Sequence, residues 1–323
     1  MNVYDDVKIG RLISQNRIVM PPMHTGMASN GHVTDDLVNY YMERAVYSRP
    51  GVIITEHSYI DRCGMASETQ LSIAEDGMVE EHRRLTIAIH KGGCLAFAQL
   101  NHAGSNGVCD PVSASNVCNP KAQELRAPRA LDTDEIRGIE KLFETAAIRA
   151  VKAGYDGVEI HCAHGYLLNQ FYSPITNKRS DEFGGSLENR LRFLLDTLEL
   201  VKNAVGEKVP VAVRLGGCDY MDGGSTEEDA VKAAVILEKA GTDLLDISGG
   251  MCGFIVKGLP EPGYFASMSE KIRKAVSIPV MMTGGVKTPA EAQMLINAGK
   301  ADLIGIGRAL FNDSHCLLET VLQ

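Results

Sequence analysis

Residues 159–191 read EIHCAHGYLLNQFYSPITNKRSDEFGGSLENRL, and no other stretch says as much about the fold. A β-strand pattern starts at residue 157, and an amphipathic helical pattern begins near Ser186. His161, His164 and Tyr166 stand where the predicted strand ends. Polar side chains at the carboxyl ends of parallel strands form catalytic sites in α/β barrels, so the stretch predicts a β/α unit that carries part of a site.

The same alternation of strand and helix continues through the rest of the chain. Short β-rich apolar runs alternate with longer segments of helical period, which is typical of a parallel sheet with crossover helices. Predicted strands cover residues 17–20, 51–55, 95–100, 157–161, 211–215, 243–247, 280–283 and 303–306. Predicted helices cover residues 35–48, 75–90, 134–153, 187–205, 226–240, 267–275 and 289–298.

Eight strand and helix units predict an α/β fold of the (β/α)8 TIM barrel type, with one domain over residues 1–323. An open Rossmann sheet is disfavoured because no G-x-G-x-x-G follows the first strand. Residues 7–12 are expected to form a small hairpin that closes the amino-terminal end of the barrel. Ser225 or Thr226 predicts one helix N-cap, and Thr288 before Pro289 predicts another.

Composition and charge exclude several classes of partner. The 323 residues carry a formal net charge of −9 and no basic run, which argues against nucleic-acid binding. Residues 1–10 lack the apolar core of a signal peptide, and no stretch reaches the ~18 apolar residues of a membrane span. We therefore expect a cytoplasmic protein. Eight cysteines lack C-x-x-C pairs, so we expect mostly buried thiols in a reducing compartment.

The last two predicted strands end in phosphate-binding patterns. They finish in T-G-G at residues 283–285 and G-I-G-R at residues 305–308, where TIM barrels bind phosphate through backbone N–H groups. Glycine lets a ligand approach the backbone closely, and an arginine supplies a cation. The alternative is that these glycines only turn the chain. Because both loops carry the pattern, we predict a phosphate site at Gly284, Gly285, Gly307 and Arg308.

Polar residues recur at the same predicted rim. Taken singly, each has a structural explanation; Gln99 could satisfy backbone groups, and Arg214 could pair with Glu159. Their convergence on one face favours a catalytic site instead. The H-x-x-H spacing lacks the H-E-x-x-H context of a zinc helix, so we predict no metal. The rim residues are His24, Gln99, His102, His161, His164, Tyr166 and Arg214.

Several motifs, in order along essentially the whole chain, resemble those of the Old Yellow Enzyme family of FMN-dependent ene reductases. They are NRIVMPPMHTG at 16–26, AQLNHAG at 98–104, HCAHGYLLNQF at 161–171, SPITNKRSDEFGGSLENR at 173–190, and the two glycine-rich strand ends. The resemblance implies FMN at the carboxyl rim and NADH or NADPH as reductant. It assigns cofactor binding to Pro21, Pro22, Met23, His24, Gln99, Arg214, Gly284, Gly285, Gly307 and Arg308.

The resemblance also implies a catalytic reaction. FMN reduced by NAD(P)H would deliver hydride from its N5 atom to the C=C bond of an α,β-unsaturated carbonyl compound. His161 and His164 can bind the carbonyl oxygen of this small enone or enoate, and Tyr166 can protonate the α-carbon. Arg214 would stabilise negative charge on the reduced flavin. A homo-oligomer is compatible with the family.

Other functions remain open from the sequence. An NADH oxidase, a flavin reductase or an amine dehydrogenase would share the cofactor frame, whereas a metal-dependent hydrolase or a ligand-binding barrel would not. The H-T-G at residues 24–26 resembles the 2,4-dienoyl-CoA reductase and enoate reductase branch, whose members continue into iron–sulfur and nucleotide-binding domains. Either a clusterless reductase or the barrel part of a longer protein fits. Loops 60–71, 104–128 and 249–264 are expected to wall the pocket.

Overall fold

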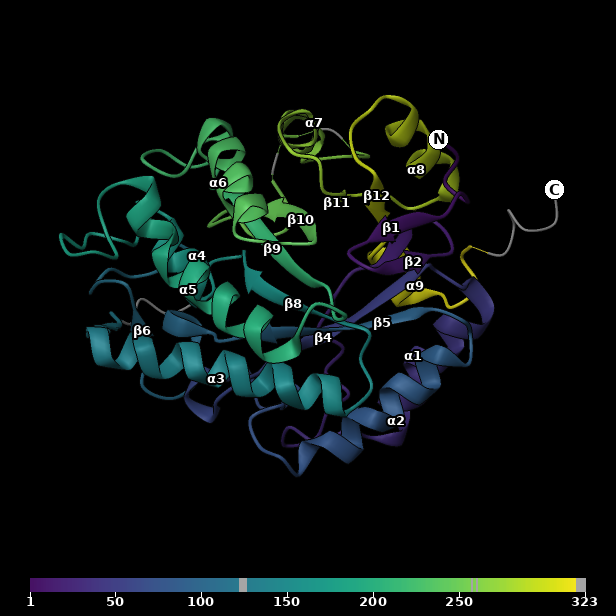
Figure 1. The fold of residues 1–323 in the computed structure, drawn as a ribbon, viewed down its shortest axis with the longest axis horizontal. Helices are drawn as coiled ribbons and strands as arrows, with labels where there is room; N and C mark the ends of the chain where they lie inside the picture. Colours follow the sequence, from purple (N-terminus) through teal and green to yellow (C-terminus); the bar gives the residue numbers. More distant parts are fainter. Residues whose placement is uncertain (122–126, 257, 260, 318–323) are drawn as a thin grey trace.

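A computed structural model describes residues 1–121, 127–256, 258–259 and 261–317 (Figure 1). Eight parallel strands close into a barrel in the order β10-β11-β12-β3-β4-β5-β8-β9, which confirms the predicted TIM barrel. The strands are β3 (Ile18–Met20), β4 (Val52–Tyr59), β5 (Leu95–Asn101), β8 (Gly157–Cys162), β9 (Val211–Cys218), β10 (Leu244–Gly249), β11 (Val280–Thr283) and β12 (Leu303–Gly305).

Helices follow the barrel strands and surround them (Figure 1). They are α1 (Asp35–Glu43) with its π-helical extension η1 (Arg44–Ser48), α2 (Met78–His90), α3 (Thr133–Lys152), α5 (Leu187–Val205), α6 (Glu227–Lys239), α7 (Ala266–Ala275) and α8 (Pro289–Asn297). All the predicted helices are therefore confirmed. Within the described residues, none of the helices has the length and hydrophobicity needed to cross a membrane.

Local sequence explains where several elements begin. Thr226 caps α6 through a capping box with Asp229, and Thr288 caps α8 with Pro289 in its first turn, as predicted. The prediction ended β4 at residue 55 because the polar residues Glu56 and His57 resemble the start of a loop. In the structure both lie buried within the strand. The pairing of β4 with β5 is irregular between Thr55 and Ser58.

Short elements escaped prediction because they span too few residues to show a hydrophobic period. They are α4 (Leu167–Tyr172), α9 (Arg308–Asn312), the 3-10 turns η2 (Arg62–Gly64) and η3 (Gly104–Asn106), and the paired strands β6 (Val112–Ser113) and β7 (Arg129–Ala130). The predicted long loop at residues 104–128 is thus partly ordered by η3 and β6, and its residues 122–126 lie outside the described part.

The amino-terminal hairpin closes one end of the barrel, as predicted. β1 (Val7–Ile9) pairs antiparallel with β2 (Leu12–Ser14). Ile9 is fully buried and packs in one apolar cluster with barrel residues such as Val19 and Phe97. Gly10 at the turn has φ +56, and a Cβ there would lie 3.1 Å from Pro210 Cβ. The hairpin therefore seals the barrel interior from water at the end opposite the site.

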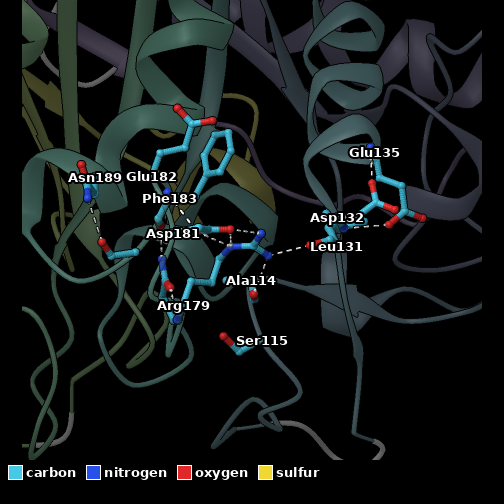
Figure 2. A network of polar contacts seen from close by, with 12 residues as sticks. Ala114, Ser115, Leu131, Asp132, Glu135, Arg179, Asp181, Glu182, Phe183 and Asn189 are labelled. Carbon is cyan, nitrogen blue, oxygen red and sulfur yellow. Dashed lines mark hydrogen bonds and ion pairs between the residues drawn. The ribbon is translucent and has the colours of Figure 1, made fainter.

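The motif at residues 173–190 ties loops together rather than lining the cavity. Arg179 Nη1 donates to the carbonyl oxygens of Ala114 (3.1 Å) and Leu131 (2.6 Å), and its other nitrogens bond Asp181 (Figure 2). Asn177 Nδ2 donates to the carbonyl oxygens of Phe171 and Phe183 (both 2.7 Å), which lie before and after it in the chain. The segment after β8 is thereby fixed to the long connection between β5 and α3.

Arg179→Met should lower the free energy of unfolding by about 2–4 kcal/mol, because it leaves two loop carbonyls and a carboxylate without their partner. The Arg179 side chain is only 11% exposed, so water replaces these bonds poorly. Urea unfolding measures the change. Arg192→Met is the matched control, because Arg192 lies just beyond the same motif and its side chain is 41% exposed. It should change stability by less than about 0.5 kcal/mol. Equal losses in both variants would contradict the proposed tie.

Candidate active site

The carboxyl ends of the barrel strands surround a cavity of about 390 Å³. Ligand pockets commonly have this size or more. The structure brings together all thirteen residues predicted for catalysis or cofactor binding on the lining of this cavity: Pro21, Pro22, Met23, His24, Gln99, His161, His164, Tyr166, Arg214, Gly284, Gly285, Gly307 and Arg308. Their roles stay predictions, since location alone does not show what each one does.

Two of the three loops expected to wall the pocket do not line it, and several lining residues were not predicted individually as site residues. These residues are His57, Ser248, Phe254, Ile255, Tyr264, Thr283, Val286, Lys287, Gly305 and Phe311. Loop 249–264 contributes three of them, as expected of a wall, although its residues 257 and 260 lie outside the described part. None of residues 60–71, and none of the described part of 104–128, lines the cavity. The first of these loops lies behind His24, whose Nε2 is 3.2 Å from Thr69 Oγ1.

A strained turn after β8 positions the histidine pair. His161 is on the strand, whereas His164 and Gly165 both have left-handed backbones, with φ of 58 and 72. This conformation costs a non-glycine residue about 1–2 kcal/mol. The turn is held because Gly165 N donates to Asn169 Oδ1 at 2.8 Å. It brings the His164 ring to 5.1 Å from the His161 ring and its Nε2 to 2.8 Å from Ser248 Oγ.

Both histidines are neutral at ordinary pH. Burial, followed by the charge of Arg214 and of neighbouring imidazoles, holds the pKa of His161 and of His164 well below its usual range. A neutral imidazole offers one donor and one acceptor. His161 Nδ1 is buried without a partner among the described residues. Two neutral rings side by side can therefore donate hydrogen bonds to one incoming oxygen without carrying positive charge themselves.

Tyr166 stands beside the pair at the amino-terminal cap of α4. Its ring centroid lies 5.1 Å from that of His161. Burial raises the pKa of the phenol, so the hydroxyl keeps its proton at neutral pH. A protonated phenol next to two neutral donors can deliver a proton to a substrate atom that those donors help to position.

Charged groups form a layer inside the barrel below the cavity. Arg214 on β9 and Asp246 on β10 are register partners, with Nε and Oδ2 3.1 Å apart. On the other side, Gln99 Nε2 donates to Glu159 Oε1 at 2.8 Å. Arg214 therefore pairs with Asp246 rather than with Glu159. Burial raises the pKa of both carboxyls, and the neighbouring charge of Asp246 raises that of Glu159 further, so Glu159 keeps its proton at neutral pH.

Two cations flank the glycine-rich ends of β11 and β12. Arg308 Nη2 lies 2.9 Å from Tyr264 Oη and 3.2 Å from Glu261 Oε1, while Lys287 Nζ lies 3.1 Å from Glu261 Oε2. Gly285 has φ +76, and a Cβ there would lie 2.9 Å from Glu261 Cγ. The donors and the open backbone fit a phosphate group, which would compete with the exposed Glu261 for the two cations.

The residues of β4 that sequence analysis missed carry a second polar cluster. His24 Nδ1 lies 3.3 Å from Oε2 of the buried Glu56, which also accepts from Thr25 N at 2.7 Å. His57, next along the strand, faces the cavity. The sequence did contain a signal for these residues, because Glu56 and His57 directly follow the apolar run of residues 51–55. In the structure the whole strand is buried. Among the described residues, no group of three or more acidic, histidine or cysteine side chains could hold a metal ion.

A barrel that buries a guanidinium under its cavity and keeps two cations at its last two strands is suited to a large, negatively charged redox group. The fold and site are those of a flavin-dependent oxidoreductase of the barrel class. The chain matches, over residues 2–321, the model of the NADH:flavin oxidoreductase / NADH oxidase family, and it belongs to this family, which includes Old Yellow Enzyme. FMN, with NAD(P)H as reductant, is thus its cofactor.

Individual relatives support the assignment. An NADH oxidase of Thermoanaerobacter brockii is 38% identical over 97% of this chain and 49% of its own length. The chain thus spans about half of that relative. An NADPH dehydrogenase of Bacillus velezensis is 34% identical over 93% of this chain and 88% of its own length. The solved Old Yellow Enzyme homologue from Zymomonas mobilis superposes with a TM-score of 0.82 at 32% identity, covering 95% of this chain and 89% of that chain.

Glu159→Gln should flatten the dependence of stability on pH. A carboxyl with a higher pKa in the folded chain binds more protons when folded, so its contribution is full below its ordinary value of 4.5 and is lost as pH rises above it. The loss approaches about 1.4 kcal/mol per pH unit while Glu159 stays protonated. Urea unfolding of the flavin-bound protein between about pH 5 and pH 9 measures it. Glu199→Gln, exposed on α5, is the control; parallel curves for wild type and Glu159→Gln would refute a protonated Glu159.

Proposed function

We propose that the protein is an ene reductase, which uses NAD(P)H to reduce the C=C bond of a small α,β-unsaturated carbonyl compound. The observation that carries the proposal is the neutral histidine pair with Tyr166 beside it in the same cavity. The ring of His161 lies 5.1 Å from the rings of both His164 and Tyr166. An oxygen-binding pair next to a proton donor is what the addition of hydride and proton across an activated alkene requires.

FMN, when bound, supplies the hydride. His161 and His164 bind the carbonyl oxygen of the substrate and stabilise the negative charge that collects there as the β-carbon becomes saturated. Tyr166 then gives its phenolic proton to the α-carbon and recovers a proton from solvent. The alkene gains two hydrogens, and the carbonyl group is unchanged. Since both histidines are neutral, they donate hydrogen bonds without surrendering protons, which leaves the proton transfer to Tyr166.

The rest of the cavity holds the cofactor in this proposal. Arg214 would face the part of the flavin that becomes negative, and its partner Asp246 fixes the guanidinium. The oxygen of Gln99 would be available to the flavin because its nitrogen bonds Glu159. The two cations at the ends of β11 and β12 would bind the phosphate. The segment after β3, which consists of Pro21, Pro22, Met23 and His24, would hold the flavin ring.

A second candidate is an NADH oxidase, because a relative of that name is 38% identical to this chain. Reduction of dioxygen needs the same flavin, but it gives no role to a pair of carbonyl-binding histidines with a phenol beside them. The part of the relative that this chain does not cover leaves room for a longer reductase of which this barrel is one section. The histidine pair favours the ene reductase.

An anaerobic absorbance titration tests the proposal. Addition of NADH, and in parallel NADPH, should bleach the flavin absorbance, and cyclohexenone should then restore it. Restoration by cyclohexenone under anaerobic conditions supports ene reduction. A flavin that returns only on admission of air would instead support the NADH oxidase and reject the ene reductase.

Tyr166→Phe should slow the return of the absorbance with cyclohexenone by about 10²- to 10⁴-fold, the usual worth of general acid catalysis. Bleaching by nicotinamide should keep its wild-type rate, because that half-reaction needs no proton from the phenol. Stopped-flow absorbance measures both rates. Tyr47→Phe, an exposed tyrosine outside the cavity, is the matched control. Equal slowing of both half-reactions in Tyr166→Phe would exclude its role as proton donor.

A further inference from the structure

His57 is a buried imidazole of the cavity to which neither the family motifs nor the proposed reaction gives a role. It belongs to β4, is 9% exposed and lines the cavity. Its ring centroid lies 5.3 Å from that of Tyr166, 5.8 Å from that of His24 and 6.3 Å from that of His161. His57 is therefore a close neighbour of both Tyr166 and His161 in the cavity.

Two amides fix which nitrogen of His57 carries the hydrogen. Gln70 Nε2 and Asn101 Nδ2 both lie 3.0 Å from His57 Nδ1. Gln70 accepts with its oxygen from Ala66 N at 2.6 Å, so the amide nitrogen is the atom that faces the ring. An amide NH2 group can only donate, and Nδ1 must therefore accept. In a neutral imidazole the hydrogen then resides on Nε2.

The protein also keeps this imidazole uncharged. Burial, with the charges of His24 and Arg214, lowers the pKa of His57 to about 3. Positive charge from Arg214 and the two amide donors all oppose a second proton on the ring. Among the described residues, Nε2 has no hydrogen-bond partner, and the Nε2–H group is a fixed neutral donor at the cavity wall.

We propose that His57 is a substrate-binding residue that selects alkenes bearing a hydrogen-bond acceptor at both ends of the double bond. This rests on the ene reductase function. With one carbonyl oxygen on His161 and His164, a second acceptor carried by the β-carbon extends away from that pair toward the neighbouring His57. The ring centroids of His57 and His161 are 6.3 Å apart, so donors on the two rings can reach opposite ends of one short conjugated unit bound against them.

The chemistry of the reaction is unchanged by this contact. The β-carbon still receives hydride, the α-carbon still receives the proton of Tyr166, and the second acceptor keeps its bonds. His57 gives up no proton, because its neutral Nε2–H only donates a hydrogen bond. A second electron-withdrawing group polarised by that bond makes the alkene more electrophilic. A substrate without the second acceptor covers the Nε2–H group without giving it a partner, which weakens its binding.

Binding of two matched enones to the oxidised, flavin-bound protein tests the proposal without turnover. Isophorone has one carbonyl, and ketoisophorone has a second at the other end of the alkene. Dissociation constants come from the change in flavin absorbance on titration. Wild type should bind ketoisophorone about tenfold more tightly than isophorone, the equivalent of one net hydrogen bond. His57→Phe should lose that preference and leave the affinity for isophorone within about twofold.

The control is His82→Phe, which removes another buried, hydrogen-bonded imidazole outside the cavity. It should retain the wild-type preference. Equal loss of affinity for both enones in His57→Phe would overturn the proposal, and so would an altered flavin spectrum without ligand, which would place the imidazole on the cofactor. If His57→Phe does not fold, equal affinities of wild type for the two enones still refute it. A wild-type flavin that cyclohexenone cannot reoxidise refutes the ene reductase function itself.

Discussion

The structure depends on a guanidinium buried inside a closed barrel. Arg214 cannot be hydrated there, and it is held by Asp246, with Glu159 and Gln99 completing the layer. Burying such charges is costly, and partners such as Asp246 offset part of that cost. The hairpin β1–β2 closes the amino-terminal end, where Ile9 packs into the barrel. At the other end the layer faces the cavity, so a flavin bound there would lie against the charge of Arg214.

Above this layer, the protein arranges neutral donors rather than charges. Burial, together with the positive charge of Arg214, keeps His57, His161 and His164 unprotonated. The left-handed backbone at His164 brings its ring edge-on to that of His161. Under the proposed function these neutral imidazoles would bind the oxygen that acquires negative charge, and Tyr166 would supply the proton. The electrostatics of the barrel interior would then also decide which group donates the proton.

The sequence was sufficient to predict the barrel, since strands such as β11 and helices such as α5 combine a clear hydrophobic pattern with clear ends. It was also sufficient to gather the thirteen predicted site residues, because consecutive strand ends of a barrel must meet at one rim, although His102, also predicted at that rim, does not line the cavity. It failed where tertiary contacts override local pattern. Glu56 and His57 resemble a loop but extend β4, and loop 60–71 lies behind His24 instead of in the wall. The tautomer of His57 depends on its contacts with Gln70 and Asn101, and the positions of these residues in the sequence do not predict those contacts.

The Arg179 contacts join the segment after β8, which carries the turn at His164, to the connection between β5 and α3. These two stretches are distant in sequence, and a further bond from Lys178 N to Ser115 Oγ also holds them together. In evolutionary terms they form one module: recombination that replaces the second stretch alone would present foreign carbonyl groups to an unchanged arginine. Diversity in this family is therefore expected to enter through loop 249–264, which lines the cavity without belonging to that module.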